Sequence, residues 1–121
     1  MKDIIINIAQ DFNRRPVGRS RKNSSHSGEA FRDDILLPKL QEVIEINDGS
    51  KILVDFTGTT MQGSSFLEEA FGGILRNYNF TADILKKYLT IVSPRRPAIE
   101  QTIWQYIEEQ QSRNKKGILN F

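Results

Sequence analysis

Two adjacent serines, Ser64 and Ser65, are the residues of this sequence best placed to handle a phosphate group. Before them come a short apolar run over residues 52–54, then Asp55, then a turn rich in glycine and threonine; an apolar-periodic segment follows them. This order predicts a strand, a loop and a helix that opens at the serines. A helix start presents unpaired backbone N–H groups and the positive end of the helix dipole. We therefore expect the serines to hold the phosphate of a ligand or to carry one themselves.

These polar residues also have purely structural interpretations. Ser65 and Glu68 match the S-x-x-E capping box, in which each side chain accepts a hydrogen bond from the backbone N–H of the other residue. Ser64 is equally well explained as a small turn residue. Asp55 is expected to accept hydrogen bonds from backbone N–H groups of the turn at Thr57–Thr60, because no nucleophile–base pair accompanies it.

Catalytic and metal chemistry have few suitable residues. The sequence contains one histidine, His26, in a serine-rich loop, and it contains no cysteine. The common zinc arrangements cannot be built without a second histidine or any cysteine, and disulfides are excluded. A lone loop histidine is more often solvated than catalytic. We therefore expect a non-enzymatic protein that needs no cofactor.

The spacing of apolar residues predicts the elements that position these groups. A length of 121 residues suits one domain with a single core. Strands are predicted around residues 4–8, 51–56 and 89–92. Helices are predicted over 28–46, which Pro38 should kink or divide into 28–36 and 38–46, over 64–75, and from Pro97 to about Ser112. Residues 113–121 are expected to be a loose tail, of which residues 118–121 could instead dock as an edge strand.

Strands that alternate with helices predict an α/β fold in which crossover connections make strands parallel. Val17–Ser20 is a candidate for one more brief strand. We expect a single small domain over residues 1–121, with helices packed on a mixed sheet of about four strands. No apolar run reaches the roughly 18 residues needed to cross a bilayer, and the N-terminus lacks the pattern of a signal peptide. The expected location is therefore the cytoplasm, without membrane contact.

Residues 10–26 form a predicted loop with a strong positive charge. It carries five basic residues against one acid, Asp11; the basic residues are Arg14, Arg15, Arg19, Arg21 and Lys22. Such a loop can bind nucleic-acid phosphates or an acidic partner, although no aromatic residue after Phe12 is present for base stacking. The alternative is a solvated, mobile loop. The net charge of +2 adds little to either interpretation.

Three segments resemble the STAS-like family, relatives of the STAS domains of anti-sigma-factor antagonists. They are Gly18-Arg19, Ser27 to Arg32, and Val54 to Gly72. The resemblance implies a regulatory interaction module that binds a kinase-like, ATP-binding protein. In the antagonists a kinase phosphorylates the first serine of an Asp-Ser-Ser-Gly-Leu turn. Ser64 falls on that position here, with Gly63 in place of the aspartate and Phe66 in place of the glycine.

Residues in and around these segments are the candidates for binding a partner or an anion. They are Arg19, Ser27, Gly28, Arg32, Asp55, Thr57, Gly63, Phe66 and Glu69, with Ser64 and Ser65 as phosphorylation candidates. Arg32 has two explanations, a salt bridge to an acid at position 29, 33 or 34, or contact with an anion in the site.

Two alternative functions stay open. One is nucleotide or phosphate binding at Gly63–Ser65 with Arg19 or Arg32, although the sequence has no P-loop or G-x-G-x-x-G motif. The other is nucleic-acid binding by the basic loop at residues 14–22.

Overall fold

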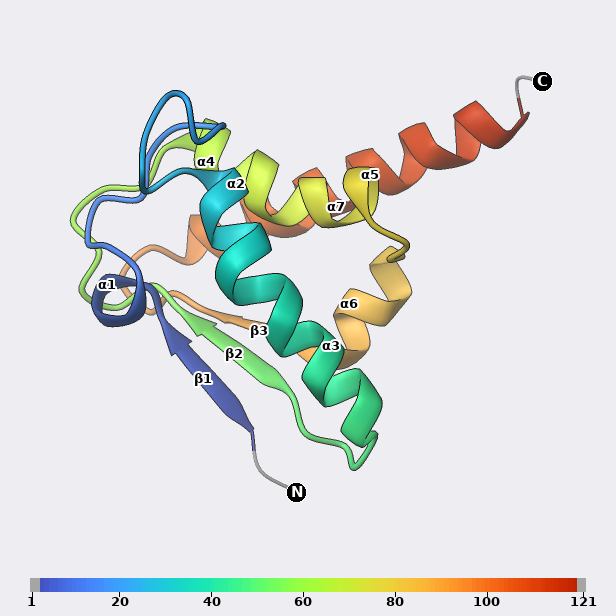
Figure 1. Ribbon diagram of the computed structural model, residues 1–121, viewed down its shortest axis with the longest axis horizontal. Helices are drawn as coiled ribbons and strands as arrows, with labels where there is room; N and C mark the ends of the chain where they lie inside the picture. Colours follow the sequence, from blue (N-terminus) through green and yellow to red (C-terminus); the bar gives the residue numbers. More distant parts are fainter. Residues whose placement is uncertain (1–2, 120–121) are drawn as a thin grey trace.

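A computed structural model describes the chain over residues 3–119 (Figure 1). Strands and helices alternate, which confirms the α/β class. In chain order the elements are β1 (Ile4–Asn7), α1 (Ile8–Asp11), α2 (Gly28–Phe31), the π-helix η1 (Arg32–Leu36), α3 (Leu37–Ile46), β2 (Ile52–Asp55), α4 (Ser64–Leu67), the π-helix η2 (Glu68–Gly72), α5 (Gly73–Asn77), α6 (Ala82–Tyr88), β3 (Leu89–Val92) and α7 (Pro97–Leu119).

The sheet in the described part of the chain has three strands in the order β1-β2-β3, all parallel. The expectation of a mixed sheet of about four strands is therefore wrong for residues 3–119. Residues 17–20 do not form the extra strand, because backbone carbonyl groups of this segment bind the start of α2 instead. The carbonyl oxygens of Gly18 and Arg19 accept hydrogen bonds from the backbone N–H groups of Gly28 and Glu29, at 2.9 and 3.0 Å. This segment therefore satisfies the free donors at the start of α2.

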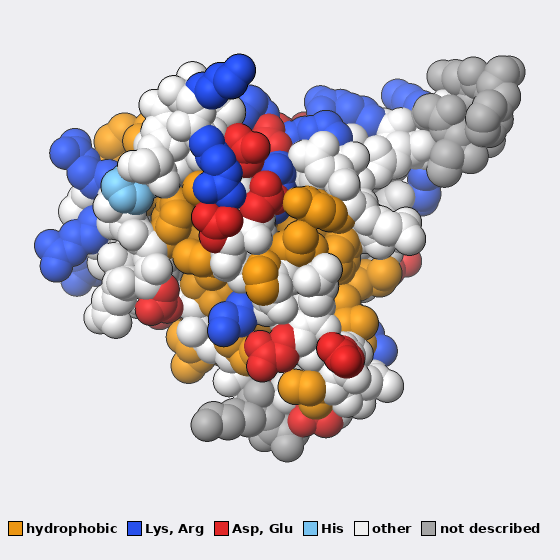
Figure 2. Space-filling model, in the orientation of Figure 1, with side chains coloured by type: hydrophobic (Ala, Val, Ile, Leu, Met, Phe, Trp, Pro, Cys, Tyr) orange, Lys and Arg blue, Asp and Glu red, His pale blue; other side chains and the backbone are white. Residues whose placement is uncertain are grey.

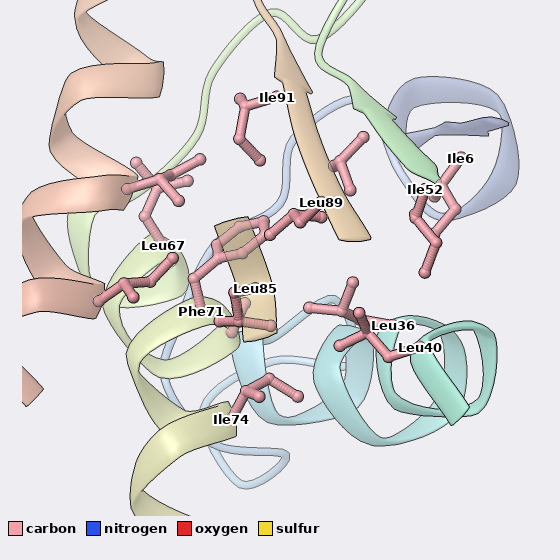
Figure 3. Close-up of a cluster of buried hydrophobic side chains, with 14 of the residues drawn as sticks. Ile6, Leu36, Leu40, Ile52, Leu67, Phe71, Ile74, Leu85, Leu89 and Ile91 are labelled. Carbon is pink, nitrogen blue, oxygen red and sulfur yellow. The ribbon is translucent and has the colours of Figure 1, made fainter. Parts of the chain in front are cut away.

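The two faces of the sheet differ in burial. Alternate strand residues are buried against the helices; they are Ile6, Ile52, Val54, Leu89 and Ile91. Figure 3 shows Leu36, Leu40, Phe71, Ile74 and Leu85 from the helices directed toward these strand side chains. The intervening strand residues face away from this core, and Ile5 is 65% exposed. This arrangement follows from two successive crossovers in the same direction, which place their helices on one face of a parallel sheet.

The first helical run contains the predicted division near Pro38. The helical path continues from α2 through η1 into α3, and Pro38 lies in the first turn of α3. The N–H of Leu37 donates to the carbonyl oxygen of Arg32, five residues back, which is the π-helical pattern. A proline cannot donate to the preceding turn and crowds it. The wider π turn lets the chain remain helical at this position.

A second helical run extends from Ser64 to Asn77 through α4, η2 and α5. It matches the helix expected after the serines, and it buries Phe66, Phe71 and Ile74. The short helix α6 that follows it was not among the predicted elements. Its sequence signal is Thr81, whose Oγ1 accepts a hydrogen bond from the Ile84 N–H at 3.3 Å and caps the helix.

The last helix, α7, begins at Pro97 as expected but extends to Leu119. The alternative of an edge strand is therefore wrong for residues 118–119, which are helical, and residues 120–121 lie outside the described part of the chain. One reason for the longer helix is that Asn114 Nδ2 donates to the carbonyl oxygen of Leu75, at 3.1 Å, and so attaches this turn to α5. Beyond this contact α7 projects past the other helices (Figure 1).

Candidate functional site

The serine pair lies at the start of the second helical run. Ser64 is the first residue of α4, Gly63 is the N-cap, and both serines are exposed. The predicted capping box between Ser65 and Glu68 is wrong. Ser65 lies inside the helix rather than at its N-cap, and the Glu68 carboxylate binds two arginines instead. The hydroxyls of both serines are thus left at the surface.

The strand end before the serines has the structural role expected of it. Asp55 Oδ1 accepts a hydrogen bond from the backbone N–H of Thr57 at 2.9 Å, which fixes the turn. Asn7, which lies opposite Asp55 in the sheet, donates from Nδ2 to the Thr57 carbonyl oxygen at 3.4 Å. Asp55 and Thr57 therefore shape the loop that leads to the serines.

Three further candidates are structural residues below the surface. Ser27 is fully buried and caps α2, its Oγ accepting a hydrogen bond from the Ala30 N–H at 3.2 Å. Gly28 lies where α2 meets the second helical run: an added Cβ would come within 2.6 Å of the Phe66 carbonyl oxygen. The Phe66 ring is buried against Phe31. These residues position the serines and do not contact solvent.

A cluster of opposite charges, which we call the Arg–Glu cluster, joins the loop and both helical runs. Its members are Arg19, Arg32, Asp33, Glu68, Glu69 and Arg76. Figure 2 shows acidic and basic side chains interleaved over α2, α4 and α5. Because three arginines face three carboxylates, the cluster is balanced in charge.

Glu68 and Glu69 connect the exposed and buried parts of this cluster. Glu68 pairs with Arg19 and, at 2.9 Å, with Arg76. Glu69 accepts from Arg32 Nη1, from Arg76 at 3.0 Å and from Arg19 at 3.2 Å. The Arg32 and Glu69 side chains are only 6% and 13% exposed. The ion pair is therefore largely shielded from water, and removing either partner would leave a buried, unpaired charge that destabilises the fold.

The pKa values follow this pairing. Burial alone would raise the pKa of Glu68, but hydrogen bonds from Arg76 and Arg19 outweigh it and hold the pKa below its ordinary value. For Arg32, burial acts to lower the pKa, and the carboxylates of Asp33 and Glu69 more than compensate. Each of these groups keeps its charge at neutral pH.

Further hydrogen bonds extend the cluster on both sides. On one side the Tyr78 hydroxyl donates to Asp33 Oδ1 at 2.9 Å, and this bond with burial raises the pKa of Tyr78. On the other side Arg76 Nη1 donates to Gln110 Oε1 at 2.9 Å, which connects the cluster to α7.

The sequence indicated only part of this cluster. A salt bridge from Arg32 to Asp33 was one of its two predicted explanations and is confirmed, at 2.8 Å. The bond from Arg32 to Glu69 and the role of Arg76 were missed. One available signal was the spacing of Arg76, which follows Glu69 by seven residues and so lies two helical turns away on the same side.

The basic loop is partly neutralised and well anchored. Arg19 pairs with the two glutamates, and Arg21 makes a two-pronged contact with Asp34 at 2.8 and 3.1 Å. His26 Nε2 lies 3.2 Å from Asn13 Nδ2, and the ring edge packs on Phe12. The cation surplus expected for binding nucleic acid is therefore smaller than the sequence indicates.

The described residues form neither a metal site nor a membrane-spanning helix. No group of His, Asp and Glu side chains between residues 3 and 119 could hold a metal ion. No helix within that range has the length and apolar character needed to span a membrane.

The described sheet is parallel, and its central strand β2 leads through a Gly-Ser-Ser turn into α4. The family model described as a STAS-like domain of unknown function, DUF4325, matches residues 27–94, more than half of the chain. The chain therefore belongs to this family, and the resemblance drawn from its sequence is confirmed. No curated protein and no solved structure matches the chain.

Proposed function

We propose that this protein is a non-enzymatic regulatory module of the cytoplasm that binds a protein partner through the surface around Ser64. The observation that carries the proposal is the pairing of exposed serines with exposed apolar side chains. Val17 and Met61, 38% and 43% exposed, lie on the two segments that lead to this surface. Apolar side chains that are exposed close together are a feature of surfaces that a partner covers.

The two segments form one continuous surface. The Gly63 N–H donates to the Pro16 carbonyl oxygen at 3.1 Å. A Cβ built on Gly63 would lie 3.5 Å from Val17 Cγ2, which is ordinary van der Waals contact. We call this surface, made of Val17, Met61, Ser64 and Ser65, the serine surface.

The partner we propose is a kinase-like, ATP-binding regulator, as the resemblance to anti-sigma-factor antagonists implies. In this proposal, phosphorylation of Ser64 releases the partner. Phosphate would place up to about two negative charges on a surface that must lose water on docking, which costs binding free energy.

The Arg–Glu cluster gives phosphorylation a second effect. Ser64 lies one helical turn before Glu68, since the Glu68 N–H donates to the Ser64 carbonyl oxygen. A phosphate there repels the Glu68 carboxylate and competes with it for Arg19, whose side chain is 47% exposed. In this proposal Arg19 shifts from Glu68 toward the phosphate, which changes the charged edge of the serine surface while the backbone hydrogen bonds of the loop remain in place.

Affinity capture with matched variants tests this function. The wild type, coupled to a support, is expected to retain an ATP-binding kinase-like protein from the host extract. Met61→Asp and Ser64→Asp should each weaken binding of that purified partner by about tenfold or more, because each places a charge on the serine surface. Ile46→Asp is the control: Ile46 is 54% exposed at the far end of α3.

Two results would contradict the proposal. One is a partner whose affinity falls equally with Met61→Asp and Ile46→Asp, since the serine surface would then have no special role. The other is Ser64→Asp binding as tightly as the wild type, which would remove the switch. Intact-mass spectrometry of the protein from its own host, with fragment mapping, tests directly for phosphate on Ser64 or Ser65.

A further inference from the structure

A second candidate site lies at the carboxyl ends of β2 and β3. A partly open cavity of about 190 Å³ is lined there by residues 56–60, residues 93–96 and Ile99 of α7. In open α/β sheets, ligands bind in the crevice outside the carboxyl ends of the strands. Neither Ser64 nor Ser65 lines this cavity.

The lining of this cavity is basic and rich in hydroxyl groups, and it contains no carboxylate. Its polar members are Thr57, Thr59, Thr60, Ser93, Arg95 and Arg96. The Arg95 guanidinium is exposed and makes no hydrogen bond or ion pair with any residue between 3 and 119. The hydroxyls of Thr57 and Thr60 are likewise without partners in that range. These donors are available to an anion.

Other residues hold the rim in place before any ligand arrives. Arg96 donates to Gln62 Oε1 at 3.1 Å and to the Thr60 carbonyl oxygen at 3.3 Å, which joins the two loops. Ser93 Oγ donates to the Arg96 carbonyl oxygen at 2.6 Å. Gly58, with a φ of +94°, turns the first loop against Ala9 of α1. A rim ordered in this way loses little conformational freedom on binding.

We propose that this cavity binds the phosphate group of a small phosphorylated metabolite. A phosphate offers three acceptor oxygens, which a guanidinium fork and two threonine hydroxyls can satisfy together. Phe56 and Ile99, both buried, give the cavity an apolar wall for the organic part of the ligand. The volume is below the roughly 300–1,000 Å³ typical of drug-sized ligands, so the ligand is a small one.

Titration of the full chain with phenyl phosphate, followed by amide chemical shifts, tests the site. Saturable shifts are expected at residues 57–60 and 93–96. Arg95→Gln should raise the dissociation constant about tenfold, because it removes the free charged donor. Lys22→Gln is the matched control: it removes the same charge from an exposed loop residue that does not line the cavity. It should leave the constant within about twofold of the wild type.

Four outcomes would overturn the proposal. Shifts confined to residues 14–22 or 63–65 would place the anion on the basic loop or at the helix start. Equal weakening by Arg95→Gln and Lys22→Gln would show attraction by overall charge alone. If inorganic phosphate binds as tightly as phenyl phosphate, the cavity does not recognise the organic part of a ligand. Thr60→Val, which keeps the charge and the shape, should also weaken binding; unchanged affinity in both Thr60→Val and Arg95→Gln would exclude the cavity.

Discussion

Gly28 and the carbonyl oxygen of Phe66 are so close that a Cβ atom on Gly28 would lie 2.6 Å from that oxygen. The same atom would be 2.9 Å from Glu69 Cβ and 3.0 Å from the Ala70 backbone nitrogen. Backbone therefore meets backbone where α2 crosses the second helical run. Backbone atoms cannot rotate away as a side chain can, so this contact fixes the distance between α2 and the serine-bearing helix.

Gly28→Ala is expected to destabilise the protein by about 1–3 kcal/mol, because the added methyl group forces the two helices apart. Urea unfolding measures this loss. Gly63→Ala is the matched control, since its Cβ would meet no atom closer than 3.5 Å and should cost less than about 1 kcal/mol. Equal losses in the two variants would show that the close contact carries no special cost.

Glu69→Gln should lower the free energy of unfolding by about 1.5–3 kcal/mol, because Arg32 then keeps its buried charge with only Asp33 as an acidic partner. The comparison is Glu108→Gln, which breaks the surface pair with Lys86, where both side chains are more than half exposed. That change should cost less than about 1 kcal/mol. The idea fails if the two variants have the same midpoint of unfolding.

The stability of the protein should fall in acid through the Arg–Glu cluster. The pKa values of Glu68 and Asp33 lie below the ordinary 4.5 and 3.8; burial opposes this, but hydrogen bonds from Arg76 and Arg19, and from Arg32 and Tyr78, prevail. A depressed folded-state pKa gives stability that is complete above the unfolded-state value and is lost as pH falls through the folded-state value.

Urea unfolding at a series of pH values measures this effect. The contribution of these two groups is expected to be intact above about pH 5 and to decline below it. In Glu68→Gln the decline should be shallower than in the wild type, because one of the two groups no longer titrates. A decline of unchanged steepness would mean that Glu68 has the same affinity for protons in the folded and unfolded chains.

A charge at position 64 should interact with Arg19. In a double-mutant cycle, removing Arg19 by Arg19→Ala is expected to make Ser64→Asp less favourable by about 0.3–1 kcal/mol, since Arg19 contacts Glu68, one helical turn from position 64. Arg21→Ala is the control, because Arg21 lies in the same loop with nearly the same exposure but pairs with Asp34. A coupling of equal size with Arg21 would indicate only the general charge of the loop.

The sequence predicted the strands and the long helices because their apolar residues repeat regularly. Ile52 and Val54 alternate with half-buried residues, and Phe66, Ala70 and Ile74 recur at helical spacing. The position of the serines at a helix start followed from the same pattern. These elements are set by local periodicity, which a single sequence displays.

The remaining features depend on contacts between distant residues. Arg32 and Glu69 are 37 residues apart, and no periodicity connects them. The extra strand predicted at Val17–Ser20 fails for a similar reason, since its carbonyl groups meet the free N–H groups of α2. The cavity beside β2 and β3 likewise forms only when two loops from different parts of the chain come together.

Arg96 connects the two surfaces to which we assign ligands. It lines the cavity, and it also holds Thr60 and Gln62, which flank Met61 on the way to the serines. A molecule in the cavity that moves Arg96 also moves the segment on which a protein docks. The two binding events are then linked reciprocally: whatever factor the small molecule applies to the affinity of the protein, the protein applies to the affinity of the small molecule.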